Sequence, residues 1–141
     1  MLKIKNFLTN QRGLTLVELL AVVVILAIVS SIATVSIGRV IQNAREDAVR
    51  ADAIQILNAA ELYVSQGGDD EEIVRETLGD LLAHEGAFEN SGVVWTVSRK
   101  SDGQLGFTGM ASAGSQFMVF YKATVSDINN AERGQLIIPE Q

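Results

Sequence analysis

Residues 12–31, which read RGLTLVELLAVVVILAIVSS, decide the fold of this chain. From Leu19 to Gly38 there are 20 residues without a formal charge, and Leu, Val, Ile and Ala dominate among them. At about 1.5 Å per helical residue, such a run is roughly 30 Å long, which matches the hydrocarbon thickness of a bilayer. Because lipid obliges the backbone to satisfy its own hydrogen bonds, the run predicts a membrane-spanning α-helix.

The charges that flank the apolar run bear on its orientation. Three Lys or Arg residues lie within residues 1–13, and three more lie within residues 39–50. The number of positive side chains is therefore equal on the two sides, and the N-terminal amine adds one positive charge to the N-terminal side. A bulky C-terminal domain is translocated regardless of its charge. We therefore expect a single-pass precursor in the cytoplasmic membrane with its N-terminus inside.

Glu18 places a carboxylate near the start of this run. A charge at the centre of a span costs on the order of 2.5–3.5 kcal/mol, and less near an interface. Residues of this kind are functional candidates by default. The alternative is that the Glu18 side chain only snorkels to the lipid headgroups.

The residues around Glu18 resemble the leader of type IV pilins and pseudopilins. In that family a short basic leader ends in Gly, and a hydrophobic residue, Thr-Leu-[Val/Ile]-Glu and a long apolar stretch follow. The matching residues here are Gly13, Leu14, Thr15, Leu16, Val17 and Glu18. The resemblance implies that a prepilin peptidase cuts between Gly13 and Leu14 and then N-methylates Leu14. It also implies that Glu18 pairs with the terminal amine of a neighbouring subunit, since a charge in a low-dielectric filament core needs a partner.

The chain departs from the commonest form of this family in three respects. Leu14 stands where Phe is usual, the apolar helix contains no proline, and the chain has no cysteine. The absence of cysteine and the presence of Leu14 together favour a Gram-positive type of system. The absence of proline bears instead on local unwinding of the helix within the filament, a feature that accompanies proline in many relatives. An ordinary signal peptide, cut near Ser31-Ile32-Ala33, is the competing interpretation, but such a cut discards Glu18.

The composition excludes some classes of function. The chain has 141 residues and a net charge of 11 − 17 = −6, and without its first 13 residues the balance is 8 − 17 = −9. This acidity argues against direct nucleic-acid binding, which rests on clustered Lys and Arg. The absence of cysteine removes disulfides, thiolate nucleophiles and thiolate metal sites.

The domain organisation follows from the leader and the span. We expect a cleaved basic leader at residues 1–13, a transmembrane or filament-core helix at 14–38 and a globular head at 39–141. The helix is predicted to continue through residues 39–66, where Gly67-Gly68 ends it. Apolar residues at helical spacing predict the stripe that packs on the head: Val40, Ile41, Ala44, Ala48, Ala51, Ile54, Leu57 and Leu62.

The remainder of the head reads as a short helix followed by strands. Four acids at residues 69–72 suit the start of a helix over about 70–84. The pattern over about residues 93–138 predicts an antiparallel sheet of three or four strands, with Trp95 in the core. Phe117, Val119 and Tyr121 are one possible set of side chains that face the core. The fold class is therefore α+β, with the second half of the long helix packed on a small antiparallel sheet.

No set of residues in the chain points to catalysis. The acids at 69–72 could hold calcium, but their spacing is not that of an EF-hand loop. His84 is the only histidine, and we expect it to be solvated. We therefore expect no metal site, no cofactor and no enzymatic activity.

The expected function is that of a structural subunit of a type IV pilus or pilus-like filament at the cell surface. The implied partners are other copies of the chain or related pilins, the prepilin peptidase, and an assembly ATPase with its membrane platform. A competence pseudopilin for DNA uptake and the major pseudopilin of a secretion system are the alternatives within the class. A monomeric membrane-anchored binding protein is the alternative from a different class.

Overall fold

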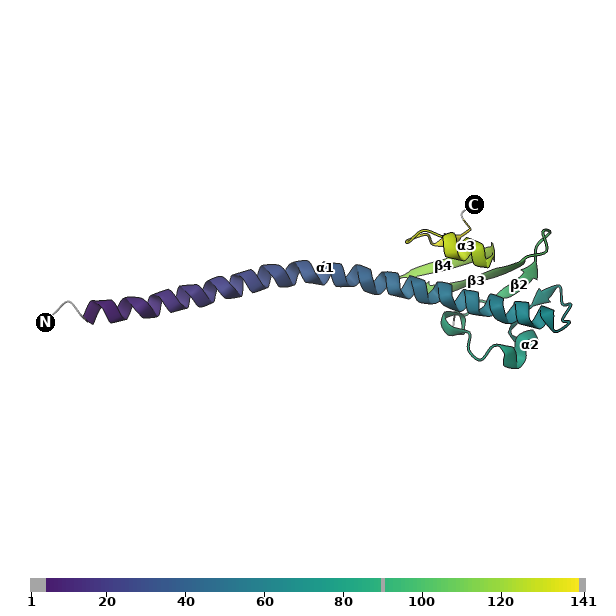
Figure 1. Ribbon diagram of the computed structural model, residues 1–141, viewed down its shortest axis with the longest axis horizontal. Helices are drawn as coiled ribbons and strands as arrows, with labels where there is room; N and C mark the ends of the chain where they lie inside the picture. The colour runs from purple at the N-terminus through teal and green to yellow at the C-terminus, as the bar shows by residue number, and fades with distance from the viewer. Residues whose placement is uncertain (1–4, 90, 140–141) are drawn as a thin grey trace. The chain divides into compact units, whose positions relative to one another are not determined.

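The computed structural model describes the backbone of residues 5–89 and 91–139, and the side chains of residues 15–33, 37–89 and 91–139. Helix α1 spans Lys5–Ser65 (Figure 1), so it begins nine residues before the predicted start at Leu14, where 14 − 5 = 9. The chain separates into two compact units, Met1–Val40 and Ile41–Gln141.

The described part of the first unit is helical, and its surface is mostly apolar. All described side chains of residues 15–33 are exposed, and the helix contains an 18-residue window of mean hydropathy 2.8. By length and composition, this helix can cross a membrane. The Ser30 and Ser31 hydroxyls donate to the carbonyls of Leu26 and Ile28, both over 2.7 Å, so these polar groups are satisfied within the helix.

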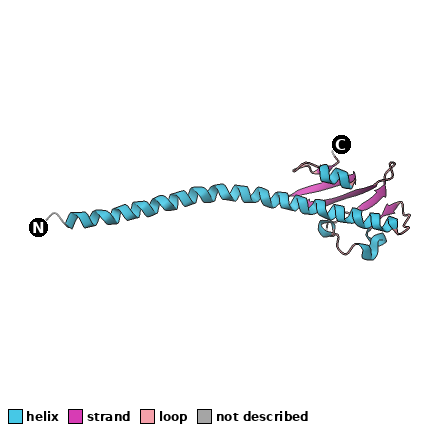
Figure 2. Cartoon of the chain, in the orientation of Figure 1, coloured by secondary structure: helices cyan, strands magenta, loops and turns pink. Residues whose placement is uncertain are grey.

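The second unit contains a five-stranded mixed sheet (Figure 2). Its strands, in spatial order, are β1 (Glu72–Ile73), β2 (Thr96–Arg99), β3 (Leu105–Ala113), β4 (Gln116–Ala123) and β5 (Ile137–Ile138). The first four pair antiparallel, whereas β5 joins β4 in parallel. The α+β class is confirmed, but the prediction of a wholly antiparallel sheet of three or four strands was wrong. The two edge strands have two residues each, which is too short for an alternating pattern.

The predicted helix over 70–84 was also wrong. Within that range residues 72–73 form β1, and α2 covers only Arg75–Leu78, followed by the 3₁₀ turn η1 at Gly79–Leu81. Gly79 has φ of +50°, a left-handed conformation that ends α2 after one turn. A second 3₁₀ turn, η2, spans Gly86–Phe88.

Helix α1 packs on the head with a different face from the predicted stripe. The buried residues on α1 are Val49, Ala53, Ile56, Leu57, Ala59, Ala60 and the carboxylate Glu46. Of the predicted stripe, only Leu57 is buried, while Ile41 and Leu62 are each 47% exposed. Both sets have helical spacing, and the sheet surface selects between them.

An aromatic cluster forms the centre of the head. Phe107 packs edge-on against Phe88 and Phe120, with ring centroids 4.9 and 5.5 Å away, and Trp95 lies 6.1 Å from it. Trp95 is 3% exposed, which confirms its predicted place in the core. The proposed inward set was wrong, because Phe117 and Tyr121 are 60% and 53% exposed.

Helix α3 (Val125–Asn130) follows β4. Its N-terminus carries a reciprocal cap, in which the Asp127 carboxylate accepts from the Thr124 backbone N–H over 2.9 Å and from the Thr124 hydroxyl over 2.8 Å. The backbone N–H of Asp127 donates in turn to the Thr124 hydroxyl. This capping box satisfies donors that α3 would otherwise leave free.

Asp127→Asn is expected to lower the free energy of unfolding by about 1 kcal/mol near neutral pH, since a cap contributes roughly that much. The backbone hydrogen bond from Thr124 holds the pKa of Asp127 below its ordinary value, although partial burial opposes this. A depressed folded pKa stabilises the fold above the unfolded pKa of about 3.9, and this contribution is lost as pH falls through the folded pKa. Denaturant unfolding at pH 7 and at about pH 3 should therefore show the deficit of the variant shrinking in acid. An equal deficit at both pH values would contradict this role for the cap.

Candidate functional site

The candidate site lies in the first unit, on the N-terminal part of α1. The backbone of Gly13 and Leu14 is helical, and their side chains lie outside the described residues. Glu18 is exposed, and its neighbours Leu16 and Val17 are 71% and 65% exposed. Glu18 is also the only formally charged residue between Gly13 and Gly38.

The exposure of this segment has a direct physical consequence. Apolar surface of this extent must be covered by lipid or by other protein chains. Once covered, the Glu18 carboxylate loses its water and needs a positive partner. Cleavage after Gly13 would create a positive group of this kind, the amine of Leu14, which lies one helical turn before Glu18 in the same chain.

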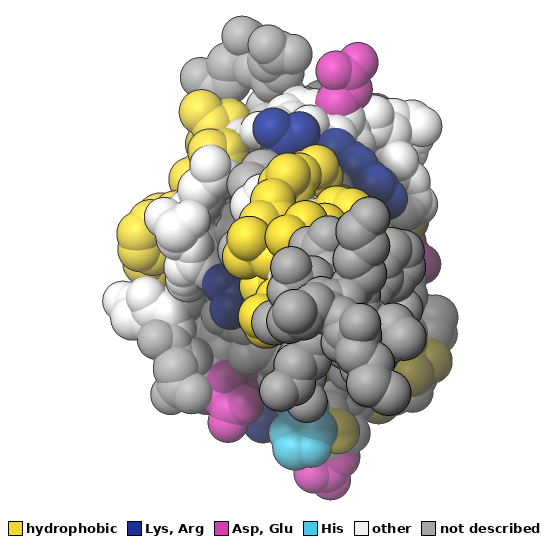
Figure 3. All heavy atoms as spheres, turned by 90° about the vertical axis from the view of Figure 1, so that its left-hand side faces the viewer, with side chains coloured by type: hydrophobic (Ala, Val, Ile, Leu, Met, Phe, Trp, Pro, Cys, Tyr) yellow, Lys and Arg dark blue, Asp and Glu magenta, His cyan; other side chains and the backbone are white. Residues whose placement is uncertain are grey.

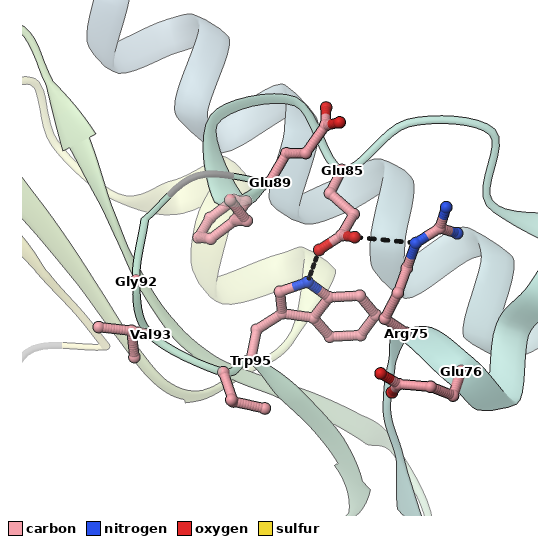
Figure 4. A pocket seen from close by; sticks show the side chains of 9 residues that line it. Arg75, Glu76, Glu85, Glu89, Gly92, Val93 and Trp95 are labelled. Carbon is pink, nitrogen blue, oxygen red and sulfur yellow. Dashed lines mark hydrogen bonds and ion pairs between the residues drawn. The ribbon is translucent and has the colours of Figure 1, made fainter.

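The head contains a second cluster of polar side chains, which Figure 4 shows from close by. The Trp95 indole N–H donates to Glu85 Oε2 over 2.6 Å, and Arg75 Nε lies 2.8 Å from Glu85 Oε1. Arg75 Nη1 also donates to the Leu82 carbonyl over 2.6 Å. Glu85 therefore has a partner for each oxygen, and the cluster joins the α2–η1 turns to the strand region.

The other residues that the sequence offered as possible metal ligands, His84 and the acids at 69–72, all of them in the described part of the chain, do not form a site together. Among the described residues, no three His, Cys, Asp or Glu side chains gather to hold a metal ion. His84 is exposed (cyan in Figure 3), and the acids at residues 69–72 are exposed as well. Asp70 accepts a hydrogen bond from the Tyr63 hydroxyl, and this bond raises the pKa of Tyr63.

Glu46 and Arg50 lie outside the apolar stripe that the sequence predicts for this part of the helix. The structure instead buries Glu46 and half-buries Arg50, and both side chains bind the backbone of residues near the C-terminus. Polar residues at helical spacing are also typical of a solvated face, so no signal in the sequence singles these two out.

Comparison with known proteins finds a family match in the N-terminal part of the chain. Residues 8–34 match the family model described as the prokaryotic N-terminal methylation motif, the class III leader of type IV pilins and pseudopilins. This segment includes Gly13, Leu14 and Glu18. No curated protein and no solved structure matches the chain.

The matched motif, with the apolar helical segment that it contains, supports a type IV pilin-like or pseudopilin-like precursor. The class III leader with its hydrophobic helix fits a membrane-anchored precursor. The motif implies processing by a prepilin peptidase and assembly into a pilus-type system.

Proposed function

We propose that this protein is a structural, non-catalytic subunit of a type IV pilus or pilus-like filament. The observation that carries the proposal is the exposed, uncharged helix surface of residues 19–33, which lies within the matched methylation motif and is preceded by one carboxylate, Glu18. The helix serves twice, first as a membrane anchor and then as the contact between subunits. Neighbouring helices can replace lipid around it without exposing apolar surface to water.

Glu18 determines where a subunit docks when its helix moves from the lipid into the filament. A carboxylate in apolar surroundings costs free energy unless a positive group and hydrogen-bond donors face it. The methylated amine of Leu14 remains a cation and supplies that group. Apolar packing alone has no preferred register, whereas a single pair of opposite charges favours one position of a subunit along the helix bundle.

The test of the proposal is electron microscopy of sheared cell-surface fractions, with the chain identified in the fibres by mass spectrometry. Fibres that contain this chain as a repeating subunit are the expected result. Detergent-soluble single subunits without any fibre would instead support the monomeric anchor.

Processing at Gly13–Leu14 provides a separate prediction. Intact-mass measurement of the mature protein should find a chain that begins at Leu14 and is heavier by one methyl group, because the motif implies both cleavage and N-methylation. A strain without the prepilin peptidase should retain the full precursor mass. A mature chain that begins at Thr34 would instead establish an ordinary signal peptide.

A further inference from the structure

Two side chains of α1 hold the segment that connects α3 to β5. Arg50 donates from Nη1 to the Ala131 carbonyl over 2.8 Å and from Nη2 to the Glu132 carbonyl over 2.5 Å. The backbone N–H of Gly134 donates to Glu46 Oε2 over 3.1 Å. All three bonds reach backbone atoms, so they fix the path of the segment whatever its own side chains are.

The Glu46 carboxylate is buried in the head. Glu46 is 4% exposed, and its second oxygen accepts from the Gln42 side-chain amide over 3.2 Å. The same Gln42 nitrogen donates to the Ala113 carbonyl over 2.8 Å, at the end of β3. Gln42, Glu46 and Arg50 follow one another at four-residue steps, so they form a line along one side of α1.

The segment has little structure of its own. Residues 131–136 contain no helix or strand, and β5 adds only two residues to the sheet. Its attachment to β4 includes the bond from the Val119 N–H to the Leu136 carbonyl over 2.7 Å, and Ile138 is its fully buried side chain. Ala131 and Leu136 are only partly buried against the core, so the polar contacts from α1 add to a small amount of apolar packing in holding the segment in place.

We infer that residues 131–138 form a C-terminal strap, which Glu46 and Arg50 fasten and which can open while β1–β4 stay folded. Segments with few buried apolar contacts open before the core does. When the strap is closed, β5 pairs with β4 at Val119 and Phe120, on the edge of β4 that faces away from β3. An unpaired strand edge recruits other strands, so the fastening protects this edge where many copies of the chain lie close together.

Limited trypsin digestion of the full chain in detergent micelles tests the fastening. Arg133 is 71% exposed, but the peptide bond after it contains the Gly134 N–H that Glu46 accepts. A protease needs an extended stretch of chain, so cleavage at Arg133–Gly134 reports opening of the strap. Glu46→Ala and Arg50→Ala should raise the rate of this cleavage by about tenfold or more, as followed by intact mass. Glu46→Gln, which keeps an acceptor oxygen, should lie between wild type and Glu46→Ala.

The matched control is Asp47→Ala. Asp47 lies beside Glu46 on α1 and faces the same strap, but it forms only an exposed ion pair with Arg133 at 3.9 Å. Such pairs contribute little, so this variant should stay within about twofold of wild type. Wild-type rates in both Glu46→Ala and Arg50→Ala would overturn the assigned fastening. Equal acceleration after Arg99 and Lys122, with loss of the Trp95 fluorescence signal, would show that the head opens as one unit and would overturn the separable strap.

Hydrogen exchange of the wild-type chain keeps the inference testable should the variants not fold. Amides of residues 131–138 should exchange before those of β3 and the part of β4 that pairs with it. Exchange of the strap in step with β3 and β4 would contradict its independent opening.

Discussion

Glu18→Ala protein is expected to accumulate in the membrane in its processed form, while filaments disappear. Removing the carboxylate removes a desolvation cost, so insertion of the precursor should be unharmed or slightly improved. Cleavage after Gly13 should persist, because the substitution leaves the leader and the glycine intact. Docking of new subunits should fail, because breaking a buried pair of charges costs roughly 3–5 kcal/mol and leaves the Leu14 amine without its countercharge.

The measurement is fractionation of cells that express the variant as their only copy, combined with microscopy of sheared fractions. Glu18→Gln separates charge from shape, since the amide is nearly isosteric but neutral, and it should also fail. Leu19→Ala tests the apolar contact separately from the charge, because it trims the adjacent side chain, 66% exposed, and leaves Glu18 in place. Normal fibre yield from Glu18→Ala would mean that Glu18 only snorkels to the headgroups, and its role in assembly would be withdrawn.

Phe120→Ala should destabilise the head by about 3–5 kcal/mol, whereas Phe117→Ala should change its stability by no more than about 0.5 kcal/mol. Both residues lie on β4, but Phe120 is 1% exposed and Phe117 is 60% exposed. The Phe120 ring lies 5.5 Å from Phe107 and 5.8 Å from Phe88, so its removal leaves a cavity in the aromatic cluster.

Denaturant unfolding of the full chain in detergent, followed by tryptophan fluorescence, measures both effects. Trp95 is the only tryptophan, and it lies in the same cluster, so its signal reports the head and not the apolar helix. The two variants remove the same atoms from the same strand, and each serves as the control for the other. A larger loss from Phe117→Ala than from Phe120→Ala would show that the sheet faces the core with its opposite side.

The sequence by itself determined the long helix, its apolar segment and the motif. Each of these is a local signal: 20 uncharged residues in a row, a glycine pair at the end of α1, and a short motif around Gly13 and Glu18. A uniformly apolar stretch of that length has few other structures open to it, because its backbone must be hydrogen-bonded internally in lipid. The α+β class could be predicted for a related reason, since a long helical pattern followed by strand patterns permits few arrangements.

The tertiary structure alone decided which faces are buried. Helix α1 carries two apolar sets at helical spacing, and only contact with the sheet selects the one containing Val49 and Ile56, together with Glu46. The choice of the buried face also determines how the strap is held, because it directs Glu46 and Arg50 toward the backbone of the strap. These contacts join residues more than 80 positions apart in the chain. No local pattern encodes such a contact.

Strand β4 is the clearest case in which the local sequence pattern does not show which face is buried. Its two alternating sets are both partly apolar, so alternation does not reveal which side faces the core. The register shifts between Phe107 and Gly109, which pair with Ala123 and Phe120, and Lys122 has φ of +49° at this bulge. The extra residue reverses the alternation, so Ala123 is buried although Phe117 and Tyr121, at the same two-residue spacing, are exposed. A bulge exists only through the pairing of two strands, and this is why the side of β4 that faces the core became known only from the folded structure.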